Sequence, residues 1–135
     1  MNRDPKNLLL DQFQAVVGET LIRHKSILDV MSKSQEANAR ANRAVAKAVT
    51  TCGCVRIDAG KQEIPQDASL YDLGRHMNDH VEGTMCDHCL ETLEAELGRE
   101  MFYLAALCNA FGLNLHDVIL KEHQRVSALG VFHAT

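Results

Sequence analysis

The sequence has few aromatic residues, two prolines and no long apolar run. Aromatic side chains make up 4% of the 135 residues and tryptophan is absent, whereas apolar residues make up 46%. A core of Leu, Val, Ile, Met and Ala suits packed helices. No stretch approaches the roughly 18 consecutive apolar residues of a membrane-spanning helix, and residues 1–6 lead into three leucines, unlike a signal peptide. We therefore expect a soluble, cytoplasmic protein without a membrane partner.

The charge pattern excludes several classes of function. The formal net charge is −4, and the 14 Lys and Arg residues are scattered along the chain. Proteins that bind the phosphate backbone present a basic surface, so we do not expect nucleic acid as a partner. The sequence also lacks a phosphate-binding glycine loop, the G-x-S-x-G motif of hydrolases and the H-E-x-x-H motif of zinc proteases.

The spacing of the apolar residues predicts an all-α protein. Helical periodicity or strong helix propensity covers residues 5–50, 70–81, 86–111 and 115–129. Asp4 is the expected cap of the first helix, Asn114 that of the last, and Gly83 the end of the short helix. Gly18 leaves open whether the first segment is one helix or two. The length fits a single domain, residues 1–135, folded as a bundle of four to five helices.

One stretch, residues 52–67, has no helical period. Residues 55–58 alternate in polarity as in a short strand, and Gly60 and Pro65 interrupt the remainder. We expect residues 52–89 to form an irregular, cysteine-rich connection that contains the short helix. This connection is inserted between the two long helical segments.

Four cysteines are spaced as metal ligands. Cys52 and Cys54 form a C-x-C pair, and Cys86 and Cys89 form a C-x-x-C pair farther along the chain. A tetrahedral ion such as Zn²⁺ is well matched by four thiolates, and each short pair can supply two corners. In a reducing compartment, clustered cysteines bind metal more often than they form disulfides. Four cysteine ligands leave no open position for water, so the predicted zinc is structural and clamps both ends of the connection.

Other interpretations of the cysteines stay open. They are an iron–sulfur cluster, a redox-active dithiol, and cysteines that share no site. His76, His80 or His88 could replace one thiolate, although solvated surface histidines are the simpler interpretation of His76 and His80. Cys108 lies on the apolar stripe of the 86–111 helix and is interpreted as a small buried hydrophobic residue.

Polar residues interrupt the apolar stripes of the two long helices. At about 100° per residue, Glu100 falls inside the arc centred on Leu97 and Leu104, with Glu96 at its edge. The 24–50 helix carries Asn38 and Asn42 on a stripe with Ile27, Met31, Val45 and Val49. Polar groups on a buried face need partners. Glu100 would either meet an arginine or a bundle end, or line a site between helices. The two amides would either join helices or line a ligand pocket.

Two segments of the 86–129 region resemble a known family. Residues 96–104 (E-L-G-R-E-M-F-Y-L) and 107–115 (L-C-N-A-F-G-L-N-L) are similar to the later half of MazG-type nucleotide pyrophosphohydrolases, and residues 34–45 resemble the family's acidic early helix. The resemblance implies an all-α bundle, usually dimeric or tetrameric. In this family acidic residues hold Mg²⁺ and cleave nucleoside triphosphates to monophosphate and pyrophosphate. Arg99 stands where the family has an aspartate, and Ala37 and Arg40 replace further acids, so the chain resembles a degenerate relative.

These observations give three hypotheses. The first is a MazG-like homo-oligomer with a structural zinc that binds a nucleotide with weak or lost hydrolysis. Glu96 and Glu100 would then be catalytic, with Mg²⁺ as a further cofactor, and Asn38 and Asn42 would bind the ligand. The alternative is a non-catalytic zinc-binding helical regulatory or interaction protein. The third is a redox or metal sensor built on the cysteines.

Overall fold

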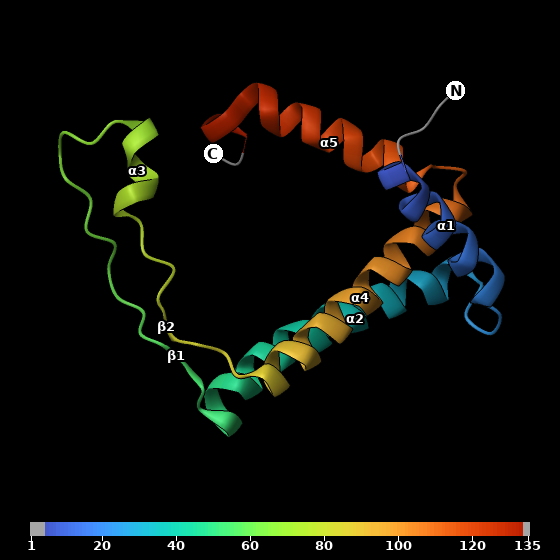
Figure 1. Cartoon of the computed structure of the whole chain (residues 1–135), viewed down its shortest axis with the longest axis horizontal. Helices are drawn as coiled ribbons and strands as arrows, with labels where there is room; N and C mark the ends of the chain where they lie inside the picture. Colours follow the sequence, from blue (N-terminus) through green and yellow to red (C-terminus); the bar gives the residue numbers. More distant parts are fainter. Residues whose placement is uncertain (1–4, 134–135) are drawn as a thin grey trace.

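Two long antiparallel helices form the centre of the molecule in this computed structural model, which describes residues 5–133 (Figure 1). They are α2 (Ile27–Lys47) and α4 (Asp87–Ala110). Ala37 and Ala105 are fully buried and Ala41 is 5% exposed. Small side chains such as these let two helices approach closely. The prediction of an all-α protein is confirmed, apart from one two-stranded ribbon.

The main hydrophobic core lies at one end of this helix pair. There α1 (Pro5–Thr20) packs on α4 and on α5 (Leu115–Leu129). The buried residues of this core are Val17, Val30, Ala105, Ala106, Cys108 and Leu115. The break after α1 falls at residues 21–26, so the first segment is two helices and Gly18 lies inside the first. Asn114 caps α5 as predicted, since its side chain accepts a hydrogen bond from the Asp117 N–H, whereas Asp4 lies outside the described residues.

An arm, residues 55–83, leaves the opposite end of the helix pair (Figure 1). A five-residue π-helix, η1 (Ala48–Cys52), follows α2 and leads into the arm. The arm consists of β1 (Val55–Ile57), α3 (Leu70–His76) and β2 (Val81–Gly83), and the two strands pair antiparallel with Val55 opposite Gly83. None of residues 56–84 is buried. At the tip, the ring of Tyr71 meets that of Phe132 in η2 (Gly130–Phe132), with ring centroids 6.0 Å apart.

The predicted helix over residues 70–81 is wrong in its second half. It ends at His76, and Gly83 lies in a strand instead of ending the helix. The side chains of Asn78 and Asp79 accept hydrogen bonds from the backbone N–H groups of His80 and Val81. Such local bonds compete with helical hydrogen bonds and favour a turn. The expected extended segment at residues 55–58 is confirmed as β1.

The apolar stripes of the long helices, predicted to be core, are largely exposed in the single chain. Leu97 and Leu104 are 46% and 44% exposed, and Met31 is 54% exposed. Asn38 and Asn42 on the same stripe of α2 are exposed as well. The buried residues of α2 are Val30, Ala37 and Ala41, so its stripe of larger residues lies beside its buried side.

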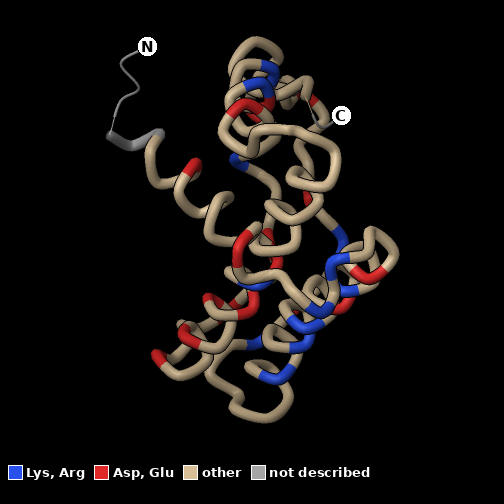
Figure 2. Tube along the Cα trace, turned by 90° about the vertical axis from the view of Figure 1, so that its right-hand side faces the viewer, with Lys and Arg blue, Asp and Glu red and all other residues tan. Residues whose placement is uncertain are grey.

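The long helices differ in charge, as Figure 2 shows by colour. In α2 the basic residues outnumber the acidic ones, and they are Lys33, Arg40, Arg43 and Lys47. In α4, Arg99 is the only cation of the helix, and the acids are Asp87, Glu91, Glu94, Glu96 and Glu100. The ion pair between Arg40 and Glu96 joins the two helices.

Among residues 5–133, no single helix is long and apolar enough to cross a membrane. The last two helical segments pass such a test by length and composition only when taken together, and they are bent by 106° at the break between them.

Candidate metal centre

The four spaced cysteines meet at the base of the arm. Cys52 ends η1 and Cys54 precedes β1, while Cys86 caps α4 and Cys89 lies in its first turn. Gly53 has a left-handed φ of 78° and its N–H donates to the Ala48 carbonyl. Glycine adopts this conformation without steric cost, which allows the tight C-x-C turn. Both chain crossings between the helix pair and the arm therefore pass through the cysteines.

The sulfur positions fit a single metal ion. All four Sγ atoms lie within 4.8 Å of one another, and those of Cys52 and Cys86 are 3.8 Å apart. In a tetrahedron with Zn–S bonds of about 2.3 Å, the sulfur atoms are about 3.8 Å apart. All five cysteines of the chain are free thiols. The predicted cluster is confirmed as a group that could hold a metal ion, and the choice of zinc stays a prediction.

Close packing of the thiols changes their acidity in opposite directions. The backbone N–H of Cys89, and next its thiol, hydrogen-bond the Cys86 sulfur and lower the pKa of Cys86 to about 7. The pKa of Cys89 is raised to about 12, chiefly by its hydrogen bond with Cys86 and then by burial. The pKa of Cys52 is also raised, above all by the hydrogen bond with Cys86. Each ionised thiolate disfavours ionisation of the neighbouring thiols. A bound cation would therefore supply the counter-charge that the fully ionised group needs.

A small apolar cluster packs around the cysteines. Ala48, Val55 and Cys89 are buried, and Val49 and Met85 pack against them. On the β2 side, Gly83 has a φ of 89°, and a Cβ at this position would lie 2.8 Å from the Cys54 carbonyl oxygen. The two strands therefore hold the C-x-C segment in place only with glycine at residue 83.

The histidines do not join this cluster. Among the described residues, the group of possible ligands contains only the four cysteines. The His80 ring lies in the arm with its Nε2 3.4 Å from the side-chain nitrogen of Gln62. Cys108 is buried in the main core, as predicted.

The structure places the predicted carboxylates in different surroundings. The Asn38 side-chain amide donates to Glu100 Oε1 at 2.7 Å, and Asn42 donates to Asn38 at 3.4 Å. Glu96 lies instead between Arg40 and Arg99, whose Nε atoms are 3.3 and 3.5 Å from its Oε2. The Glu96 side chain is only 15% exposed. Both arginines therefore neutralise a carboxylate that metal-dependent catalysis would need.

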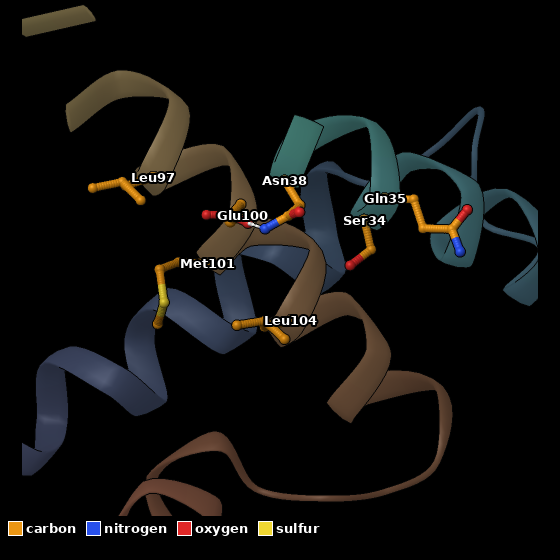
Figure 3. Close-up of a pocket in the computed structure, with 7 residues that line it drawn as sticks. All are labelled: Ser34, Gln35, Asn38, Leu97, Glu100, Met101 and Leu104. Carbon is orange, nitrogen blue, oxygen red and sulfur yellow. Dashed lines mark hydrogen bonds between the residues drawn. The ribbon is translucent and has the colours of Figure 1, made fainter. Parts of the chain in front are cut away.

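A cavity of about 500 Å³ adjoins the Asn38–Glu100 hydrogen bond (Figure 3). In the close-up these two side chains point toward each other from α2 and α4. The cavity is lined by Ser34, Gln35, Asn38, Leu97, Glu100, Met101 and Leu104. Asn42, although predicted with them, does not line it. The cavity thus offers one carboxylate, two amides and a hydroxyl beside three apolar side chains.

A second cavity, of about 310 Å³, adjoins Glu96 and is mostly charged. It is lined by Arg40, Arg43, Ala44, Lys47, Thr92 and Glu96. The α2–α4 pair thus has two cavities. The one beside Glu100 is lined by apolar and amide side chains, and the one beside Glu96 is mostly charged.

Known proteins give no further guide to the chain. No family model matches it, and searches of curated proteins and of solved structures give no match either.

Sequence reasoning missed three features of these sites. Arg40 pairs with Glu36 on its own helix and also reaches Glu96 across the helix contact. The π-helical turn before Cys52 has no signature in the sequence. The constraint at Gly83 depends on strand pairing over a separation that local patterns do not reveal.

Proposed function

We propose that this chain is a zinc-stapled helical interaction protein. A structural zinc ion held by Cys52, Cys54, Cys86 and Cys89 would fix the arm on the helix pair, and the exposed surfaces of both would bind a partner. The observation that carries the proposal is the gathering of four sulfur atoms within 4.8 Å from both sides of the arm's base. Four thiolates complete the coordination of zinc and leave no position for a catalytic water.

The exposed apolar side chains support binding as the role of the arm. A two-stranded ribbon has marginal stability alone, and this one has no buried residue beyond Val55. The exposed apolar residues of the whole arm are Ile57, Ile64, Tyr71, Met77 and Val81. Apolar groups gathered on a surface favour association because their burial releases water.

The carboxylates give weaker support to catalysis. Hydrolysis assisted by Mg²⁺ uses several carboxylates to hold the ions against the phosphates. Arg40 and Arg99 form ion pairs with Glu96. Glu100 is the one carboxylate that lines the amide-containing cavity. A single carboxylate beside a neutral amide is a poor site for two metal ions.

The second candidate is MazG-like nucleotide binding with residual pyrophosphohydrolase activity. It is favoured by the position of the Asn38–Glu100 pair at a cavity of about 500 Å³. Glu100 would hold one Mg²⁺, and Asn38 would contact the ligand. Binding without turnover would fit the loss of Glu96 to its arginine partners.

One assay separates the two candidates. Pyrophosphate release is measured from a panel of canonical and modified nucleoside triphosphates with Mg²⁺ or Mn²⁺, using protein purified without chelator. Glu100→Ala is the test variant, and Glu94→Ala is its matched control because Glu94 is an exposed carboxylate of the same helix. We expect no release from any of the three proteins. Release that persists in Glu94→Ala and disappears in Glu100→Ala would instead establish the enzyme.

A further inference from the structure

One side of the α2–α4 pair is an exposed apolar face. Met31, Asn38 and Val45 follow one another at seven-residue steps along α2, as do Leu90, Leu97 and Leu104 along α4. Residues seven apart share a side of a helix, and Asn38, Leu97 and Leu104 line the same cavity (Figure 3). The two stripes therefore lie on the same side of the helix pair, and we call these six residues the open face.

The open face is solvated although it is mostly apolar. Its five apolar side chains are all at least one-third exposed, from 36% for Val45 to 54% for Met31. The other cavity between the same helices is lined by Arg40, Arg43, Lys47 and Glu96, which suit water. A helix layer that is charged on one side and apolar on the other is normally covered on its apolar side by a further layer.

The total exposed area indicates how much surface is left uncovered. The chain exposes 10343 Å², whereas a compact monomer of 15.0 kDa exposes about 7,000 Å². The excess is thus roughly 3,300 Å², and obligate dimers bury about 1,000–2,500 Å² on each subunit. The excess, which includes the exposed arm, is larger than the area that one subunit of an obligate dimer buries.

We infer that a second copy of this chain covers the open face. The inference rests on the proposed interaction role and names the partner. Two copies that use the same face form a closed, two-fold dimer, in which one apolar face satisfies the other and no end is left to extend. The helix pairs of the two subunits then form two packed layers with Leu97 and Leu104 between them. Met31 and Val45 widen the same contact along α2.

The Asn38–Glu100 hydrogen bond gives this contact a register. A polar pair in an otherwise apolar interface disfavours shifted arrangements, because a shift would bury the amide or the carboxylate against apolar groups. The 2.7 Å bond from Asn38 already supplies one partner to the Glu100 carboxylate within each subunit. The pair can therefore lie in the interface without leaving both groups unsatisfied.

Sedimentation velocity of the metal-loaded full chain over a dilution series tests the inference. Wild type is expected to sediment with twice the 15.0 kDa mass of the chain. Leu97→Glu and Met31→Glu place a carboxylate in the apolar interface on two different helices, and each should raise the dimer dissociation constant about 100-fold or more. Arg43→Glu is the control, since it places a carboxylate on α2 at the charged cavity, and the dimer should persist.

Circular dichroism establishes that each variant keeps its helices. Wild type that sediments as a monomer at all concentrations would overturn the inference, and so would helical Leu97→Glu and Met31→Glu variants that both remain dimers. Zinc content is measured on the same samples. A dimer without bound zinc would reject the zinc staple and support a second copy as the partner. A zinc-loaded monomer would support the staple and reject the dimer.

Discussion

Replacing Gln14 with leucine is expected to weaken the corner where α1 meets α4 and α5. Gln14 is only 9% exposed. Its side-chain nitrogen donates to Asn109 Oδ1 at 2.9 Å and to the Leu113 carbonyl at 2.7 Å, and its Oε1 accepts the Leu115 N–H at 2.8 Å. Leucine is similar in size but has no polar group, so all three bonds are lost.

The expected loss follows from the partners that remain. Leu115 is the first residue of α5 and its N–H has no partner inside that helix. An unsatisfied buried group costs about 1–3 kcal/mol, while Asn109 and Leu113, which are exposed, can gain water. We therefore expect the free energy of unfolding to fall by about 3 kcal/mol, which lowers the melting temperature by roughly 10 °C.

Urea unfolding followed by circular dichroism at one protein concentration measures this loss, because self-association would make stability depend on concentration. Gln124→Leu is the control, since it removes an exposed amide from α5 and should change the stability by about 0.5 kcal/mol or less. A loss for Gln14→Leu below about 1 kcal/mol, or equal to the control, would refute the reasoning.

Three further predictions concern the arm and its base. Gly83→Ala should weaken zinc binding at least tenfold in competition with a chromophoric chelator, because the added Cβ would lie 2.8 Å from the Cys54 carbonyl oxygen. Gly60→Ala is the control: its added Cβ has no neighbouring atom within 4 Å, and the variant should bind zinc as wild type does. Removal of the metal should direct the first protease cuts to residues 56–84, where no residue is buried, and leave most of the helical signal; first cuts in α2 would contradict this. Arg56 hydrogen-bonds Glu82 and lowers its pKa from 4.5, so this pair's contribution to the ribbon is complete above that pH and is lost as the pH falls through the lower, folded-state value. NMR shifts of β1 should follow this loss below about pH 4.5, and the dependence should be absent in Glu82→Gln.

Much of the fold could be predicted because local patterns carry it. Helical periodicity places the long helices, and the Asn114 cap fixes the start of α5. The short pairs around Cys54 and Cys86 could be recognised as ligand spacing, since each pair needs only its own local turn. Once the hairpin-like arm returns to α4, the two pairs meet.

Other features depend on contacts that the local sequence does not encode. The stripe through Leu97 was expected to be core, but Leu97 is 46% exposed, whereas Ala37 and Ala105 are fully buried. Periodicity identifies an apolar side without saying which chain covers it. Glu96 likewise had the pattern of a catalytic acid, and its two arginine partners emerge only when α2 lies beside α4.

The zinc content of protein purified without chelator tests the central claim most directly. We expect about one zinc ion per chain in wild type, and less than about a tenth of that in Cys89→Ala. Cys108→Ala is the control, because Cys108 is also buried but lies outside the group of four sulfur atoms, and it should retain the wild-type content. Well-folded wild type without metal, or equal zinc in the two variants, would contradict the four-cysteine staple.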